Sequence, residues 1–125
     1  MNGLENKTIV AVDDTAAIRT FLRISLQDLG VNFYEASTAS EGLQLCKERE
    51  PDLVVLDLGL PDRDGLDVLP DIKALQKDNA PAVIILTVRS DRKTRELARE
   101  KGAAAYITKP FEMDDLIETI EEILN

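Results

Sequence analysis

The sequence predicts an α/β fold in which helices cover both faces of a parallel sheet. Short apolar runs, typical of strands buried on both faces, alternate with segments whose apolar residues recur every three or four positions, typical of amphipathic helices. The connections are short, and such alternation favours a parallel sheet. The 125 residues, 44% hydrophobic and 31% charged, indicate a single globular domain over 1–125 with its core at about 7–124.

The first strand–helix unit covers residues 8–30. Residues 8–12 (TIVAV) predict a buried strand, which ends in the carboxylates Asp13 and Asp14. Asp14 or Thr15 can cap the helix that follows, and Gly30 stops it. The predicted inward face of this helix comprises Ile18, Phe21, Leu22, Leu26 and Leu29.

The second unit begins with residues 32–36, which are more polar and predict a strand at the edge of the sheet. A helix then begins at Ser37 or Thr38 and continues to about residue 49, with Leu43 and Cys46 facing inward. Cys46 is the only cysteine, so no intrachain disulfide can form, and we expect it in the core. The absence of histidine excludes His-based triads and His metal sites.

The third unit contains the most apolar strand. Residues 53–56 (LVVL) predict a strand buried on both faces, with Asp57 at its carboxyl end, and residues 61–65 predict a turn. The next helix carries an apolar row of Leu66, Leu69, Ile72 and Leu75. Pro70 lies within this row and predicts that the helix starts late or is kinked.

The fourth unit pairs a buried strand with a polar helix. Residues 82–86 (AVIIL) predict the strand, which ends at Thr87. The charged helix over 91–101 ends at Gly102, and its few inward residues are Thr94, Leu97 and Ala98. Because helix stability comes mainly from packing, we expect this helix to be the most easily displaced element.

The fifth unit completes the sheet. Residues 104–107 predict a short strand, and the last helix, 112–124, carries Met113, Leu116, Ile117, Ile120 and Ile123. The three most apolar strands, the first, third and fourth, should be central. The predicted sheet order is therefore 2-1-3-4-5, a flavodoxin-like doubly wound (βα)5 fold with its switch point between strands 1 and 3.

Four of the predicted strands end in polar groups at one edge of the sheet. There Asp13, Asp14 and Asp57 would converge, and at about 4 Å each carboxylate pair costs about 1–4 kcal/mol. A cation should compensate, and Mg²⁺ suits an all-oxygen ligand set. Lys109 could add a second positive charge, and Thr87 offers a hydroxyl donor. These ends together suit a phosphoryl group.

The motifs resemble those of response-regulator receiver domains of two-component signalling, of the chemotaxis-regulator-like kind. The resemblance covers residues 7–124 and rests on Val12-Asp13-Asp14, Leu56-Asp57 with Leu60-Pro61 and Gly65, Leu86-Thr87, and residues 106–111 (YITKPF). It implies a signalling switch that accepts a phosphoryl group from a histidine kinase or a phosphotransfer protein. Such a domain is not an enzyme beyond catalysing its own phosphorylation and dephosphorylation.

The resemblance also implies a role for each residue of the acidic site. Asp57 would be the phosphoryl acceptor. Asp14, Asp57 and the backbone carbonyl of Gly59 would bind Mg²⁺, or Mn²⁺ as a substitute, and Asp13 would act largely through metal-bound water. Lys109 would neutralise charge on the transferring phosphoryl oxygens.

A switch and its partners follow from the same resemblance. Thr87 would hydrogen-bond the attached phosphoryl group, Tyr106 would swing inward behind it, and the Lys109–Pro110 bond is commonly cis. Phosphorylation would then alter a face formed by residues 91–124. Kinase recognition is expected around the 14–29 helix and the loop after Thr108.

The charges of the 91–124 face point to a possible self-association. Basic residues cluster on the helix 91–101 and its approach, and acidic residues on the last helix. These patches could pair between two copies related by two-fold symmetry; two solvated helix faces remain an equal alternative.

The net charge and the length of the apolar runs bear on binding partners and location. The net charge of −9 disfavours direct binding to nucleic acid or to an anionic membrane, and no run is apolar enough for membrane insertion, which indicates a cytoplasmic location. No output domain is expected within these residues, so the downstream partner is unknown.

Two other functions remain open. A pseudo-receiver would bind partners without phosphorylation, although such domains typically lose an acidic residue or the lysine that this chain keeps. A phosphatase of the haloacid dehalogenase type would resemble Asp-x-Asp after the first strand, whereas here Asp13 and Asp14 are adjacent.

Overall fold

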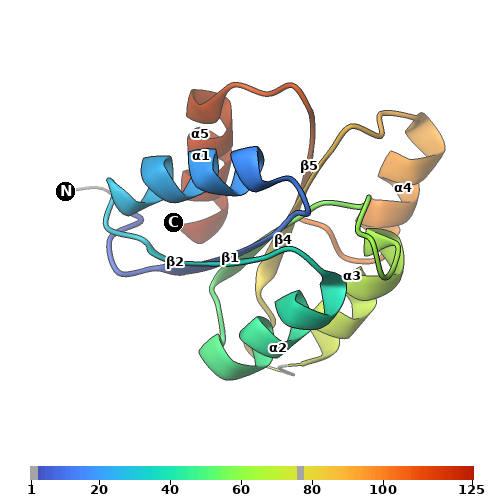
Figure 1. The fold of residues 1–125 in the computed structure, drawn as a ribbon, viewed down its shortest axis with the longest axis horizontal. Helices are drawn as coiled ribbons and strands as arrows, with labels where there is room; N and C mark the ends of the chain where they lie inside the picture. Colours follow the sequence, from blue (N-terminus) through green and yellow to red (C-terminus); the bar gives the residue numbers. More distant parts are fainter. Residues whose placement is uncertain (1–2, 76–77) are drawn as a thin grey trace.

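A computed structural model describes residues 3–75 and 78–125. In the described residues five strands alternate with five helices (Figure 1). The strands are β1 (Thr8–Val12), β2 (Asn32–Ala36), β3 (Leu53–Leu56), β4 (Ala82–Thr87) and β5 (Ala105–Thr108). The helices are α1 (Ala16–Gln27), α2 (Ala39–Arg49), α3 (Gly65–Ala74), α4 (Arg92–Glu100) and α5 (Met113–Leu124).

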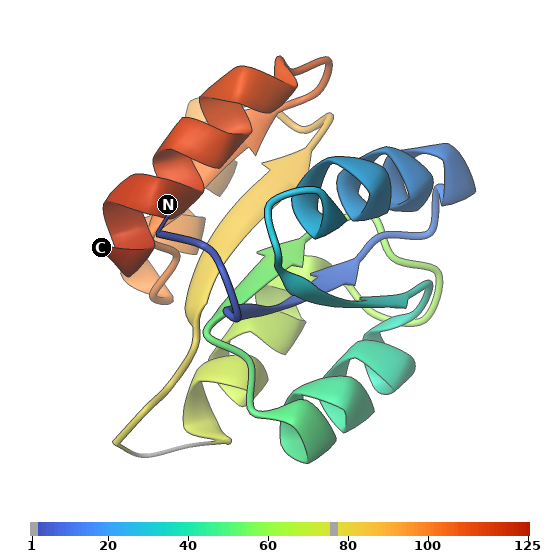
Figure 2. The ribbon, with the colours of Figure 1, turned by 90° about the vertical axis from the view of Figure 1, so that its left-hand side faces the viewer.

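The strands form one parallel sheet in the order β2-β1-β3-β4-β5, which confirms the predicted fold. Figure 2 shows this twisted sheet between two layers of helices. Successive residues of β4 alternate between the layers: Ile84 packs with α1 and α5, and Ile85 packs with α2 and α3. Because both faces are covered, the central strands are continuously apolar.

Side-chain caps determine where three helices begin. Thr38 accepts a hydrogen bond from the backbone N–H of Glu41 at the start of α2. Asp64 and Asp91 do the same for the first turns of α3 and α4. Such caps satisfy N–H groups that have no partner within the helix.

The predicted late start of α3 is wrong. The helix begins at Gly65 and includes Pro70 in its interior. The proline is exposed, and the Asp64 cap together with the burial of Val68 and Leu69 favours the helix despite the hydrogen bond that proline removes.

Two residues assigned to apolar helix faces lie outside the core. Phe21 on α1 is 45% exposed, and its ring lies 6.0 Å from that of Phe111. Leu75 is also exposed, because it follows the last turn of α3 as its C-cap.

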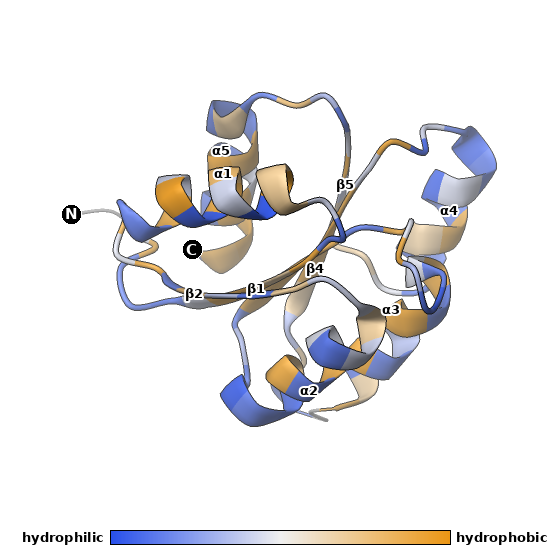
Figure 3. Cartoon of the chain, in the orientation of Figure 1, coloured by the Kyte–Doolittle hydropathy of each residue, from blue (hydrophilic) through white to orange (hydrophobic). Residues whose placement is uncertain are grey.

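The thin apolar face of α4 is confirmed. Among its residues only Thr94 and Ala98 are buried, and the helix is largely hydrophilic in Figure 3. Within residues 3–75 and 78–125, no helix has both the length and the apolar character needed to cross a membrane.

Candidate functional site

Three carboxylates gather at the carboxyl ends of neighbouring strands. Asp13 follows β1 and Asp57 follows β3, and both are buried, whereas Asp14 is exposed. Because β1 and β3 pair in parallel, their ends lie side by side. One carboxylate oxygen from each of the three residues lies within 4.8 Å of the others, so the predicted convergence is confirmed.

Lys109, on the loop after β5, supplies the compensating charge. Its Nζ lies 2.7 Å from Asp13 Oδ2 and 3.2 Å from Asp57 Oδ2. Burial lowers the pKa of this ammonium group, but the hydrogen bond and charge of Asp13, followed by Asp57, outweigh burial and raise it. The backbone N–H of Lys109 donates to Thr87 O at 2.8 Å, and the Lys109–Pro110 bond is cis, as expected.

The donor set of this cluster fits a hard divalent cation. All its potential ligands are carboxylate oxygens, and a single ammonium group leaves three carboxylates with net negative charge. A Cβ built on Gly59 would meet only Asp57 Oδ1, at 4.0 Å, so the space beside this glycine is bounded by the Asp57 carboxylate alone. Asp57 Oδ1 is held by the backbone N–H of Gly59 at 3.1 Å.

Thr87 and Tyr106 both hydrogen-bond to the backbone of Arg89, in the loop after β4. The Thr87 hydroxyl is buried and accepts the backbone N–H of Arg89 at 3.4 Å. The Tyr106 hydroxyl donates to the carbonyl of the same Arg89 at 2.7 Å, and burial raises the pKa of this phenol. The guanidinium of Arg95 lies 5.0 Å from the centre of the Tyr106 ring.

The side chain of Arg89 connects two loops beside the site, the one after β4 and the one after β3. The sequence did not predict this connection. Its Nη1 lies 3.0 Å from Asp64 Oδ2, at the start of α3, and its Nη2 lies 3.4 Å from Thr94 Oγ1. These contacts join the loop after β4 to the loop that follows Asp57.

The sequence also did not predict the structural role of Asp62. Its two carboxylate oxygens accept the backbone N–H groups of Ala39 (2.8 Å) and Ser40 (3.0 Å), which lower the pKa of this carboxyl group. The loop that carries Asp57 is thereby fastened to the start of α2.

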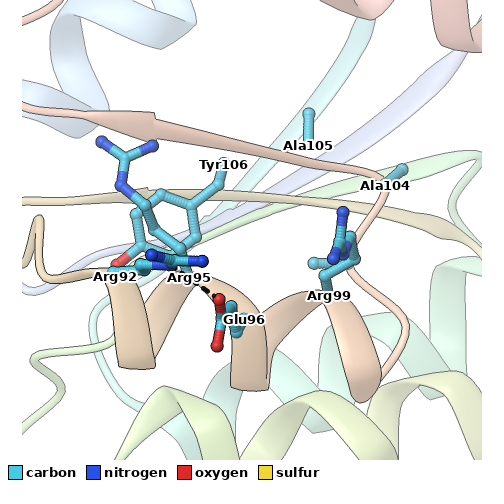
Figure 4. A pocket seen from close by; sticks show the side chains of 8 residues that line it. Arg92, Arg95, Glu96, Arg99, Ala104, Ala105 and Tyr106 are labelled. Atoms are coloured by element: carbon cyan, nitrogen blue, oxygen red, sulfur yellow. Dashed lines mark hydrogen bonds and ion pairs between the residues drawn. The ribbon is translucent and has the colours of Figure 1, made fainter.

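A separate groove lies between α4 and β5. Figure 4 shows its wall of α4 arginines facing Tyr106 and the neighbouring alanines. The groove has a volume of about 320 Å³ and is lined by Arg92, Arg95, Glu96, Arg99, Ala103, Ala104, Ala105 and Tyr106. Three arginines against one glutamate make its wall basic.

A doubly wound fold with an acidic cluster and a lysine at the carboxyl edge of the sheet is the arrangement of signalling receiver domains. Residues 9–121 match the family model described as the response regulator receiver domain. The chain therefore belongs to the response regulator receiver domain family, whose members act in two-component signal transduction.

Curated relatives include transcriptional regulators about twice as long as this chain. The KDP operon transcriptional regulatory protein KdpE of Escherichia coli is 41% identical over 108 residues, which are 86% of this chain and 47% of KdpE. The transcriptional regulatory protein PdtaR of Mycobacterium tuberculosis is 38% identical over 116 residues, 92% of this chain and 55% of PdtaR. The chain thus spans about half the length of these relatives.

Solved structures agree with the fold. A CheY-like receiver domain protein from Methanospirillum hungatei has a TM-score of 0.90 and 32% identity, covering 96% of this chain and 94% of that one. The beryllofluoride-activated NtrC4 receiver domain dimer has a TM-score of 0.86 and 30% identity, covering 94% and 95%.

Proposed function

We propose that the chain is a phosphorylation-activated switch that accepts a phosphoryl group on Asp57 in a Mg²⁺-dependent reaction. The donor is a histidine kinase or a histidine phosphotransfer protein. The observation that carries this proposal is the joint placement of Asp13, Asp14, Asp57 and Lys109 at one sheet edge, in a chain of the receiver family.

In the proposed transfer each side chain of the site has a separate role. A carboxylate oxygen of Asp57 forms the new O–P bond while the P–N bond of the phosphohistidine breaks, and the electron pair stays on the imidazole nitrogen. Lys109 Nζ, 3.2 Å from Asp57 Oδ2, neutralises charge on the phosphoryl oxygens. The Thr87 hydroxyl, at the end of the adjacent strand, donates to the attached group. Water later cleaves the O–P bond, which restores the carboxylate and releases phosphate.

Mg²⁺ would be held by Asp14, Asp57 and the Gly59 carbonyl, with Asp13 acting largely through a bound water molecule. Its chemistry would be to neutralise developing charge and to align the phosphoryl oxygens. In this proposal the chain catalyses only its own phosphorylation and dephosphorylation. We also propose that residues 1–125 form a single receiver domain.

The first experiment measures intact mass after incubation with acetyl phosphate, with and without Mg²⁺, for wild type and Asp57→Asn. We expect one added phosphoryl group that requires Mg²⁺ and is absent in the variant. Beryllofluoride with Mg²⁺ should also shift the NMR signals of Thr87 and Tyr106. Failure of both measurements would overturn the proposal in favour of a phosphorylation-independent interaction domain.

For the kinase we propose a docking surface on α1 and the loop after Thr108. Two apolar side chains support it: Phe21 is 45% exposed and contacts Phe111, and Ile24 is 58% exposed. Ile24→Glu should leave labelling by acetyl phosphate unchanged and weaken transfer from a phosphorylated histidine kinase. Equal transfer from the kinase to both proteins would contradict this surface.

We also propose that the phosphorylated chain forms a two-fold dimer through the 91–124 face. The basic wall of the α4–β5 groove and the acidic surface of α5 are complementary in charge, and the similar NtrC4 receiver domain is described as a dimer. Mass measurements by analytical ultracentrifugation with beryllofluoride should show a dimer.

A charge swap tests this dimer sharply. Arg92→Glu with Arg99→Glu reverses the α4 side, and Glu118→Arg with Glu122→Arg reverses the α5 side. Each double variant should be monomeric alone, whereas an equimolar mixture should dimerise because both symmetric contacts regain opposite charges. A mixture that stays monomeric would contradict the pairing.

A further inference from the structure

Arg19 connects α1 to the turn that carries the acidic residues. Its Nη1 donates to the backbone carbonyl of Asp13 at 2.8 Å, and its Nε donates to Glu35 Oε1, on β2, at 3.1 Å. The side chain is only 18% exposed, so little of it is available to a partner protein. Arg19 therefore works within the domain.

The carbonyl that Arg19 holds belongs to the peptide group joining Asp13 to Asp14. Because a peptide group is planar, fixing its oxygen also fixes the direction in which the chain enters Asp14. The other acceptors of Asp13 are engaged as well: Oδ1 accepts Thr15 N–H at 2.9 Å, and Oδ2 contacts Lys109. Arg19 thus completes the restraint on the two adjacent carboxylates.

Glu35 orients this arginine and offsets its charge. Its Oε1 accepts Arg19 Nε, and its Oε2 lies 2.5 Å from Arg23 Nη1. Glu35 lies on β2 directly beside Ala11 of β1, two residues before Asp13. Because the Glu35 carboxylate is paired with it, the Arg19 guanidinium acts mainly by fixing the position of the Asp13 carbonyl. Its positive charge competes little with a metal ion for the acidic cluster.

We propose that Arg19, held by Glu35, is a positioning residue that sets the affinity of the acidic site for Mg²⁺. This inference rests on the proposed Mg²⁺-dependent function and concerns the same site. Residues that orient metal ligands from behind commonly alter metal affinity by about 10–100-fold when removed. For Arg19→Leu we expect a loss of about 10-fold, at the low end of that range.

The test is a Mg²⁺ titration of the whole chain, in which two-dimensional NMR spectra of the backbone amides measure the affinity. Arg23→Leu is the matched control, since it removes the same charge from the same helix and a contact to Glu35, but no contact to Asp13. We expect Arg23→Leu to bind Mg²⁺ within about twofold of wild type, well below the effect expected at Arg19. Arg19→Lys should recover part of the affinity, because it retains a donor that can reach toward the carbonyl.

Two outcomes of the Mg²⁺ titration would contradict these proposals. If the guanidinium acted only as a nearby positive charge, both leucine variants would bind Mg²⁺ more tightly than wild type, and the positioning role would be overturned. If wild type itself failed to bind Mg²⁺, the proposed function would fail instead. The dispersion of the NMR signals shows whether Arg19→Leu folds. If it does not, Glu35→Gln is the second test of the positioning role, and it should also weaken Mg²⁺ binding.

Kinetics give a second readout that a general structural defect would not mimic. With acetyl phosphate as donor, Arg19→Leu should need more Mg²⁺ for half-maximal labelling yet reach a rate near that of wild type at saturating Mg²⁺. An equal rate loss at every Mg²⁺ concentration would contradict the inference.

Discussion

At the scale of single residues, Lys109 holds the acidic cluster together. Its raised pKa means that the folded protein binds this proton more tightly than the unfolded chain does. The resulting stabilisation is fully present below the ordinary lysine value of 10.5, and it is lost as the pH rises through the folded-state pKa.

Lys109 should accordingly titrate above 10.5 in a ¹³C NMR titration of the lysine Cε signals. Asp13→Asn removes the hydrogen-bonding carboxylate that does most to raise this pKa, so the midpoint should move down. A Lys109 midpoint at or below 10.5 in wild type would show that burial outweighs the two carboxylates.

Two glycines beside Asp57 make a matched pair for stability. A Cβ on Gly65 would lie 2.6 Å from the Asp57 carbonyl oxygen and 2.7 Å from Leu58 Cα, whereas a Cβ on Gly59 would make one ordinary contact, with Asp57 Oδ1 at 4.0 Å. We expect Gly65→Ala to lower the free energy of unfolding by about 1–3 kcal/mol, as overpacking does. Gly59→Ala should change it by about 0.5 kcal/mol or less. Urea denaturation of both variants measures the difference, and equal costs would contradict the close approach.

The acidic residues, Lys109 and Thr87 could be predicted because each directly follows or ends a recognisable strand. Tyr106 lies within β5 and was expected only from the resemblance to receiver domains. The sequence did not reveal Asp62, Arg89 or Arg19. Asp62 and its partner Ala39 are 23 positions apart, and their contact exists only once α2 lies beside the loop after β3. Charged residues in loops and on helices resemble solvated ones until their tertiary partners are known.

At the scale of elements, α4 buries less apolar side-chain surface than α5. Its two buried side chains are small, Thr94 and Ala98, whereas α5 buries Leu116 and Ile120. The amides of α4 should therefore exchange with deuterium faster than those of α5, because local opening exposes less apolar surface. Hydrogen exchange followed by NMR measures this order, and equal protection of the two helices would contradict it.

The helix boundaries show where sequence patterns lose precision. Pro70 predicted a late start or a kink because proline lacks an N–H group, but α3 starts at Gly65, where the Asp64 cap and the buried row outweigh that loss. Phe21 fits the spacing of an inward face, yet α1 turns it toward Phe111 at the rim. Periodicity identifies a helix and its apolar side, while the packing of neighbouring helices decides which residues at the margin are covered.

At the scale of the whole molecule, stability depends on a sheet covered on both faces. Ile84 and Ile85 are consecutive and fully buried, and they belong to different clusters on opposite sides of β4. Each Ile→Ala substitution should lower the free energy of unfolding by about 2–5 kcal/mol. Ile24→Ala, at an exposed position, should cost about 0.5 kcal/mol or less. If only one of the two core variants were destabilised, the two-sided core would be contradicted.

The buried Cys46 has a practical consequence for spectroscopy. Burial raises its pKa to about 12, so at neutral pH the folded chain presents almost no reactive thiolate. Val88 is 71% exposed and adjoins Thr87, and Val88→Cys would place one accessible thiol there. A maleimide dye should then attach at that position alone, without replacement of the native cysteine. The natural sequence is thus a ready background for a fluorescent sensor beside its own acidic site.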